Sequence, residues 1–387
     1  MKTMIYLDYN ATSPLYPEVL QAAEPFYREL FGNPSSLHRK GQEARAQIEK
    51  VRRQLLEMLG VSDGELIFTS GGTEADNLAI KGVARSLRSK GNHLVISAIE
   101  HSAVLQPVQM LQKEGFEVTL LTPTVEGLIT PHQVEAALTG RTILISVMHA
   151  NNELGSIQPI QDISQFAADR EILFHTDAVQ SFGKIPVHFD RLGADLMSIS
   201  AHKIGGPKGV GALVLKRGIV LEPLVHGGPH EHSRRAGTEG TAGIAAMGKA
   251  VQITLKKQAE GMPMYLAALR DRLEEGLLDR VSDVHRNGAS AKRVPNTSNL
   301  SFLNCSGETL MQALDMAGIC VSTGAACASA STEPSHVLRA LGLSDQRIGG
   351  SIRFSLGFDN TEQEIDRCLE IVPEVVERVR KSEKNRV

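Results

Sequence analysis

The stretch LMSISAHKIGGPKG, residues 196–209, decides the fold class, because an apolar run ends abruptly in polar residues and a glycine-rich turn. A buried strand that opens onto such a turn is typical of α/β sheets, whose ligands bind beyond the carboxyl ends of the strands. Lys203 stands at this point, close to Ser200, His202 and two glycines. It is either a cation solvated at the rim or an amine held close to a carbonyl partner for covalent chemistry.

Six further apolar runs alternate with helical patterns from about residue 65 onward. Runs that are apolar on both faces indicate a mostly parallel sheet covered by helices. Helices are expected at 73–89, 102–114 and 159–170, and a long helical region at 241–279. The expected strands are ELIFTS (65–70), HLVISA (93–98), EVTLLTP (117–123), TILISVMHA (142–150), ILFHTDA (172–178), DLMSIS (195–200) and GALVLK (211–216).

The pattern changes after about residue 281. Short β-rich segments, NTSNLSFLN (296–304) and SIRFSLG (351–357), alternate with helical patterns near 308–317, 334–341 and the C-terminus. This is typical of a smaller α+β unit. We therefore expect an α/β protein with a large domain of residues 15–255 and a small domain made of residues 1–14 and 256–387.

Composition describes a folded protein with a small ligand. Of the 387 residues 42% are hydrophobic and 22% charged, and the net charge of -3 lacks the basic footprint of an obligatory nucleic-acid or anionic-membrane partner. The N-terminus resembles neither a signal peptide nor a membrane span, so cytoplasm is the expected location. Four cysteines without a CxxC pair argue against a disulfide framework and against a cysteine-rich zinc site.

Asp177 and Gln180 follow the run ILFHTDA, where a parallel strand would open onto a ligand crevice. A carboxylate behind a pyridine ring would keep its nitrogen protonated and strengthen the electron sink of pyridoxal phosphate (PLP). A strand-end aspartate and a strand-end lysine one crossover later are found together in PLP enzymes. The alternative for Asp177 is a plain helix cap.

The segment FTSGGTEADN, residues 68–77, has the form strand, glycine turn, helix N-terminus, with Thr73 expected near the cap. Exposed N–H groups and the helix dipole favour a phosphate here, and Gly71 and Gly72 allow the backbone to approach it closely. An ordinary glycine turn with a threonine cap is the alternative. The segment matches neither GxGxxG nor GxxxxGK[ST].

Three further polar residues follow or interrupt apolar runs. His101 could lie flat over a planar ring and shuttle protons, or be an ordinary satisfied histidine. Asn152 could bind a carboxylate or a ring oxygen, or simply shape a turn. Arg353, inside SIRFSLG, needs an anion, which is either a substrate carboxylate or a buried ion-pair partner.

Cys327 lies in STGAACASASTEP, residues 322–334, a run of small residues with little bulk to anchor a core. A buried structural cysteine would have large apolar neighbours. This pattern indicates a thiol on a mobile loop, although no adjacent Lys or Arg explains how it would become a thiolate.

Ten segments in register resemble the NifS/IscS-type cysteine desulfurases, PLP-dependent enzymes of the class-V aminotransferase family with the aspartate-aminotransferase fold (fold type I). No single segment would decide this, but ten in family order between about Tyr6 and Gly357 make a chance resemblance implausible. They are YLDYNAT, GNPSSLH, FTSGGTEADN, EHSAV, ANNELG, HTDAVQ, SAHKIGGPKGVGAL, RRAGTEG, CASAS and SIRFSLG.

The resemblance implies a role for each matching residue. Lys203 would be the Schiff-base lysine that also removes the substrate's Cα proton, and Cys327 the thiolate that takes the sulfur. His101 would stack on the ring as a further catalytic group. The other expected cofactor contacts are Asp177 to the pyridine nitrogen, Gln180 to the ring hydroxyl, and Gly72, Thr73, Ser200, His202 and Thr238 to the phosphate, with Thr238 supplied by the neighbouring subunit of a homodimer. Asn152 and Arg353 would bind the carboxylate of L-cysteine, and Asn152 is also an expected cofactor contact.

The implied reaction converts L-cysteine to L-alanine and leaves the sulfur on Cys327 as a persulfide. The sulfur would then pass to an acceptor or iron-sulfur scaffold protein, for cluster assembly or thiolation. The form CASASTEPSHVLRALG resembles the long-loop NifS/IscS branch. The alternatives are selenocysteine lyase or another PLP enzyme of this fold, and a catalytically silent scaffold that binds partners.

One segment departs from the family's pattern. HGGPHEHSRRAGT has Pro229, His230 and Ser233 where the family usually shows Gly, Gln and Gly, which makes the Thr238 assignment less secure. The histidines at 226, 230 and 232 lack HExxH spacing and a carboxylate set, so no metal is expected.

Overall fold

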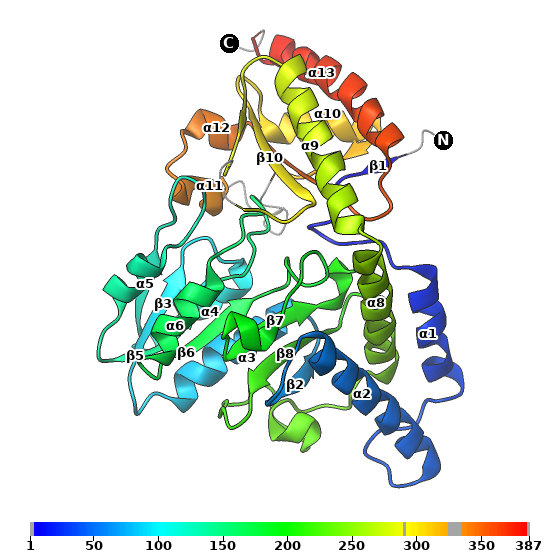
Figure 1. Cartoon of the computed structure of the whole chain (residues 1–387), viewed down its shortest axis with the longest axis vertical. Helices are drawn as coiled ribbons and strands as arrows, with labels where there is room; N and C mark the ends of the chain where they lie inside the picture. The colour runs from blue at the N-terminus through cyan, green and yellow to red at the C-terminus, as the bar shows by residue number, and fades with distance from the viewer. Residues whose placement is uncertain (1–3, 289–291, 324–333, 385–387) are drawn as a thin grey trace.

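A computed structural model describes residues 4–288, 292–323 and 334–384, and its centre is a seven-stranded mixed sheet (Figure 1). All seven expected strands form, in the order β2-β8-β7-β6-β5-β3-β4. The strands from β7 to β4 are parallel, whereas β8 is antiparallel to both β7 and β2. The strands are β2 (Gly64–Thr69), β3 (His93–Ser97), β4 (Glu117–Leu121), β5 (Thr142–Ser146), β6 (Leu173–Asp177), β7 (Leu196–Ser200) and β8 (Gly211–Lys216).

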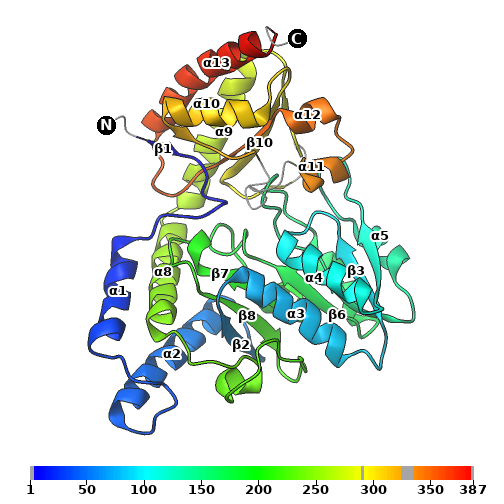
Figure 2. The same cartoon turned by 180° about the vertical axis from the view of Figure 1, so that it is seen from behind.

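Alternate residues of most strands belong to two different cores, as the two-residue period of a strand requires. Leu66 and Phe68 of β2 face one core, and Ile67 between them faces the other. The first core is covered by α1 (Pro17–Arg28), α2 (Arg39–Met58), α6 (Ile160–Ala168) and α8 (Thr241–Ala259). The second is covered by α3 (Gly72–Ser86) and α4 (Ser102–Lys113), which lie in front of the sheet in Figure 2.

A smaller unit lies above the large sheet in Figure 1 and has its own core. Its antiparallel sheet has the order β12-β10-β9, and β1 pairs in parallel with β11 beside it. Its elements are β1 (Ile5–Tyr6), α9 (Met262–Arg280), β9 (Val284–Arg286), β10 (Thr297–Phe302), α10 (Gly307–Ala317), β11 (Ile319–Cys320), β12 (Ser351–Ser355) and α13 (Glu362–Lys384). The remaining helices are α5 (Pro131–Ala137), α7 (Phe189–Leu192), α11 (His336–Ala340) and α12 (Asp345–Gly349).

The N-terminal segment joins the two units. β1 pairs with β11 in the smaller unit, whereas α1 and α2 pack against α8. The proposed domain boundary after residue 255 falls within α8, and the division into domains stays a prediction.

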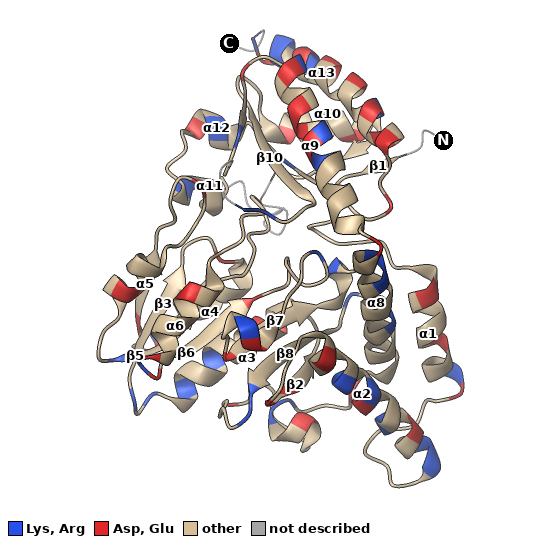
Figure 3. Cartoon of the chain, in the orientation of Figure 1, with Lys and Arg blue, Asp and Glu red and all other residues tan. Residues whose placement is uncertain are grey.

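Charges of both signs are mixed along the outer helices, as on α2, α9 and α13 in Figure 3. Among the described residues, no helix combines the length and the apolar character that crossing a membrane requires.

Candidate active site

A cavity of about 210 Å³ lies at the carboxyl ends of β5, β6 and β7 and beside the N-terminus of α3. This is the edge of an α/β sheet where ligands bind. Nine of the residues singled out in the sequence line this one cavity, although they come from five separate segments. The lining residues are Ala11, Gly72, Thr73, Asp76, His101, Met148, Asn152, Asp177, Val179, Gln180, Ser200, His202 and Lys203.

The amine of Lys203 is held by the N-terminal segment. Lys203 lies in a 3₁₀ turn directly after β7, and its Nζ donates to the carbonyl oxygens of Asn10 (2.5 Å) and Ala11 (2.8 Å). Ser13 secures the same turn, because its hydroxyl donates to the His202 carbonyl and accepts from the Gly205 N–H. The lysine is therefore placed by contacts with residues almost 200 positions away in the sequence.

Asp177 ends β6 and is almost fully buried. Burial raises the pKa of its carboxyl to about 6, while a hydrogen bond from the Val179 N–H and the charge of Lys203 act in the opposite direction. At neutral pH the carboxylate form prevails, so Asp177 supplies a buried negative charge to the cavity. The Val179 contact stabilises a turn, and no helix begins at this point, so Asp177 is not the plain helix cap of the alternative interpretation.

Two further buried carboxyl groups lie near Asp177, and the sequence analysis missed both. Burial, followed by the charge of Asp177, raises the pKa values of Asp76 and Glu100 well above their usual range. Glu100 accepts a hydrogen bond of 2.5 Å from the Met148 N–H. Burial and the nearby charge of Asp177 thus favour the neutral form of both groups.

His101 and His202 are neutral imidazoles at physiological pH. Burial, followed by the positive charge of Lys203, lowers both pKa values to about 4. His101 is the N-cap residue of α4, and its Nδ1 accepts the Ala103 N–H at 3.1 Å. Nδ1 of His202 lies 3.2 Å from the Thr12 hydroxyl.

Thr73 lies near the N-cap of α3, as expected, but the threonine cap of the alternative interpretation does not form. Gly71, not Thr73, is the N-cap residue; its φ of 151° suits only glycine, and no side chain caps the helix. Thr73 is the second residue of α3. Close by, the Ser200 hydroxyl is buried and has no hydrogen-bond partner in the described structure. An uncapped helix N-terminus beside an unpaired hydroxyl is suited to an anion.

Arg353 does not line the cavity, because it is buried in β12 and paired. Its Nη2 lies 2.6 Å from Oδ1 of Asp8, and its Nη1 donates to the Asn152 carbonyl at 3.1 Å. In the described structure the buried ion pair is thus the arrangement present. The contact with Asn152 still places the guanidinium next to a cavity residue.

Thr238 does not line the cavity of this chain. Thr238 is exposed and lines a separate pocket with Lys208, Gly209 and Arg235. Cys327 lies outside the described residues.

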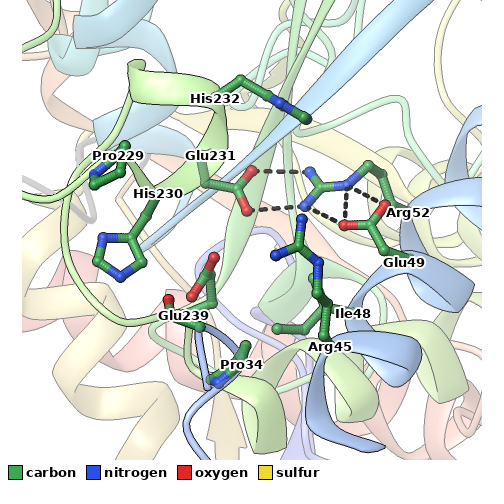
Figure 4. A pocket seen from close by; sticks show the side chains of 11 residues that line it. Pro34, Arg45, Ile48, Glu49, Arg52, Pro229, His230, Glu231, His232 and Glu239 are labelled. Carbon is green, nitrogen blue, oxygen red and sulfur yellow. Dashed lines mark hydrogen bonds and ion pairs between the residues drawn. The ribbon is translucent and has the colours of Figure 1, made fainter. Parts of the chain in front are cut away.

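The segment that departs from the family's pattern folds around a buried ion pair (Figure 4). Glu231, His232 and Ser233 all have positive φ angles, 44°, 56° and 63°. The Glu231 carboxylate, which anchors this backbone, accepts from both Nη atoms of Arg52 and from the Phe68 N–H. Figure 4 shows His230 and His232 on either side of Glu231, and no described group of three His, Cys, Asp or Glu side chains could hold a metal ion.

Two buried residues that the sequence analysis did not single out complete the site. Asn10 hydrogen-bonds with residues of several distant segments, and Lys184 donates to Gln180. In DAVQSFGK, Lys184 follows Gln180 by four residues. This spacing could have indicated their contact, because it can bring two side chains together. Asn10 had no local signal, since its partners are more than 140 residues away.

Comparisons with known proteins agree on one family. The class-V aminotransferase family model matches residues 5–368. A cysteine desulfurase IscS from Dictyoglomus turgidum is 48% identical over 380 residues, 98% of this chain and 96% of that protein. A solved NifS-like protein has a TM-score of 0.90 at 36% identity and covers 97% of this chain and 100% of its own. The structure of SspA in complex with cysteine has a TM-score of 0.80 at 36% identity, over 91% of this chain and 98% of its own.

Proposed function

Because this chain belongs to the class-V aminotransferase family and is a PLP-dependent cysteine desulfurase, we propose that it converts L-cysteine to L-alanine and holds the sulfur on Cys327 as a persulfide. The sulfur then passes to an acceptor or iron-sulfur scaffold protein. The observation that carries the site assignment is the single cavity that unites Lys203, Asp177 and His101. The cytoplasmic location stays a prediction.

The residues present fit PLP. Its phosphate suits the uncapped N-terminus of α3 and the unpaired Ser200 hydroxyl, where Gly72, Thr73 and His202 also lie. Lys203 would hold the cofactor covalently, Asp177 would face the pyridine nitrogen, and Gln180 the ring hydroxyl. The flat imidazole of His101 would cover the ring, and Asn152 would contact the cofactor and the substrate.

When bound, PLP supplies an electron sink for the electron pair left at the substrate's Cα. Asp177 supports this sink with its negative charge, which the pKa of about 6 preserves at neutral pH. Lys203 removes the Cα proton, as an amine held against two carbonyl oxygens at the cavity wall. His101 is neutral and can accept or return a proton.

Arg353 and Asn152 are the proposed holders of the substrate carboxylate. Asp8 occupies Nη2 of Arg353 in the described structure, so the substrate must either share the guanidinium with Asp8 or displace it. A guanidinium has five N–H donors, and one carboxylate partner leaves donors for a second.

We also propose a homodimer, with Thr238 of the partner subunit completing the phosphate site. Large apolar side chains on α1 and the segment after it are exposed, which is typical of an interaction surface. Leu20, Tyr27, Phe31 and Leu37 expose 60%, 73%, 68% and 90% of their surface. The exposed position of Thr238, outside its own chain's cavity, supports the same arrangement.

The test measures alanine formed from L-cysteine by the PLP-loaded protein, with Cys327→Ser alongside. Cys320→Ser is the matched control, because Cys320 is partly exposed and burial raises the pKa of its thiol. We expect alanine from the parent and the control and little from Cys327→Ser. Undiminished turnover by Cys327→Ser would refute the assignment of the nucleophile, and absence of alanine from a PLP-loaded parent, even with reductant, would refute the proposed reaction.

A further inference from the structure

Lys184 is a buried amine that has no part in the reaction described above. It is 6% exposed, and its Nζ donates to Oε1 of Gln180 (2.5 Å) and Oδ1 of Asn10 (2.7 Å). Both acceptors are neutral amide oxygens, and no ion pair among the described residues includes Lys184.

The surroundings of Lys184 disfavour a charge. Burial lowers the pKa of its amine well below the usual range, and the neighbouring cations Lys203 and Arg353 lower it further. A neutral amine has two N–H donors, which equals the number of hydrogen bonds that Lys184 makes. The geometry shows the side chain as a buried hydrogen-bond donor to two neutral amides.

These contacts determine which way the Gln180 amide faces. Its Nε2 donates to the Asn10 carbonyl at 3.0 Å, and a carbonyl can only accept. Its Oε1 is occupied by the N–H of Lys184. The reverse orientation would set oxygen against oxygen and N–H against N–H. Oε1 is therefore turned toward Lys184, and Nε2 keeps a second N–H for a further acceptor.

Asn10 makes this arrangement rigid. Its Oδ1 accepts from Lys184 and also from Asn296 (3.1 Å), while its Nδ2 donates to the Asn152 carbonyl (3.0 Å) and the Thr297 hydroxyl (2.9 Å). Its carbonyl accepts from both Gln180 and Lys203. The side chain of Lys184 is thus tied to the backbone that holds the reactive lysine.

We propose that Lys184 is a positioning residue that orients the Gln180 amide so that it presents its N–H group, and not its oxygen, to the oxygen on the cofactor ring. The inference rests on the proposed function in one respect, that Gln180 faces the ring hydroxyl of PLP. A donor at this place stabilises the deprotonated ring oxygen. When the donor is lost, the oxygen holds the neighbouring proton more tightly, and the pH midpoint of the cofactor's absorbance rises.

The experiment is a pH titration of the absorbance of the PLP-loaded protein without substrate. Lys184→Met removes the donor at similar volume, and Lys184→Gln retains an N–H donor. Lys216→Met is the matched control, because Lys216 is partly exposed at the end of β8 and pairs with Asp195. Loss of one such hydrogen bond predicts a midpoint about one pH unit higher and a kcat/KM about tenfold lower for Lys184→Met. Lys184→Gln should be closer to the parent, and Lys216→Met equal to it.

A double-mutant cycle with Gln180→Ala separates positioning from a general structural effect. If Lys184 acts through Gln180, Lys184→Met causes no further shift of the midpoint in the Gln180→Ala background. If Lys184→Met fails to fold, the same cycle is run with Lys184→Leu, which also lacks an N–H donor.

Two outcomes would overturn this inference and leave the proposed function intact. One is a pH midpoint equal to the parent's in both Lys184 variants. The other is a shift of the midpoint by Lys184→Met that is the same with and without Gln180. A parent that binds no PLP would instead refute the proposed function, and this inference with it.

Discussion

Replacement of Glu231 by glutamine tests the buried ion pair under the segment that departs from the family's pattern. The Glu231 side chain is 2% exposed and that of Arg52 10%. Oε2 of Glu231 accepts from Arg52 Nη1 (2.8 Å) and from the Phe68 N–H (2.9 Å), and Oε1 accepts from Arg52 Nη2 (2.9 Å). Glutamine keeps one acceptor oxygen but turns an NH2 group toward a donor of its neighbours.

The contacts of Glu231 set the expected loss in the free energy of unfolding. Glu231→Gln leaves the guanidinium of Arg52 without its buried counter-ion and one N–H without an acceptor, for which about 3–5 kcal/mol is typical. Arg52 keeps one other carboxylate, Glu49, whose side chain is 38% exposed. An exposed pair contributes only about 0–1 kcal/mol, so Glu49 should not compensate. The positive φ of Glu231 adds to the loss, because its side chain no longer holds the strained backbone.

Urea unfolding of Glu231→Gln and Glu49→Gln, compared with the parent under the same conditions, gives the measurement. Both variants remove one carboxylate from the same arginine, so they differ chiefly in burial (Figure 4). We expect a large decrease in the free energy of unfolding for Glu231→Gln and little change for Glu49→Gln. Equal decreases would show that burial does not set the strength of this pair and would refute the reasoning.

Three further predictions concern the cavity. In the cofactor-free protein, the parent should lose stability relative to Asp177→Asn as the pH rises from about 4 to about 6, because the folded-state pKa of Asp177 is raised. Urea unfolding across this range measures the free energy of unfolding of both proteins. A constant difference between the two at every pH would contradict the prediction. Gly71→Ala and Gly218→Ala both place alanine at positive φ with no atom within 4 Å of the new Cβ, so each should cost about 1–3 kcal/mol. Only Gly71→Ala should weaken PLP binding, and a fluorescence titration with PLP measures the affinity. An equal affinity of the two variants for PLP would exclude phosphate binding at the N-terminus of α3. Arg353→Lys should raise the KM for L-cysteine about tenfold with a smaller effect on kcat, because lysine cannot bind a carboxylate with two parallel N–H groups; an unchanged KM in initial-rate kinetics would exclude this role.

Much of the site was predictable because it lies where strands end. Asp177, Ser200 and Lys203 follow apolar runs, and parallel strands bring their carboxyl ends to one edge of a sheet. The end of β2 was predicted to within one residue, and Thr73 lies near the cap of α3 as expected, but Thr73 is not the cap residue itself. A threonine beside two glycines looks like a cap in the sequence, whereas the backbone enters α3 at a φ that only Gly71 can adopt.

The sequence by itself determined the seven strands, the mostly parallel sheet and the set of polar residues at its carboxyl edge, since these depend on the short-range alternation of apolar and polar residues. Only the tertiary structure decided which polar groups meet. Asp8 pairs with Arg353, Arg52 with Glu231, and Asn10 with Lys184, at separations of 345, 179 and 174 residues. No local pattern encodes such pairs, because each depends on how two distant segments pack and on the need of every buried polar group for a partner.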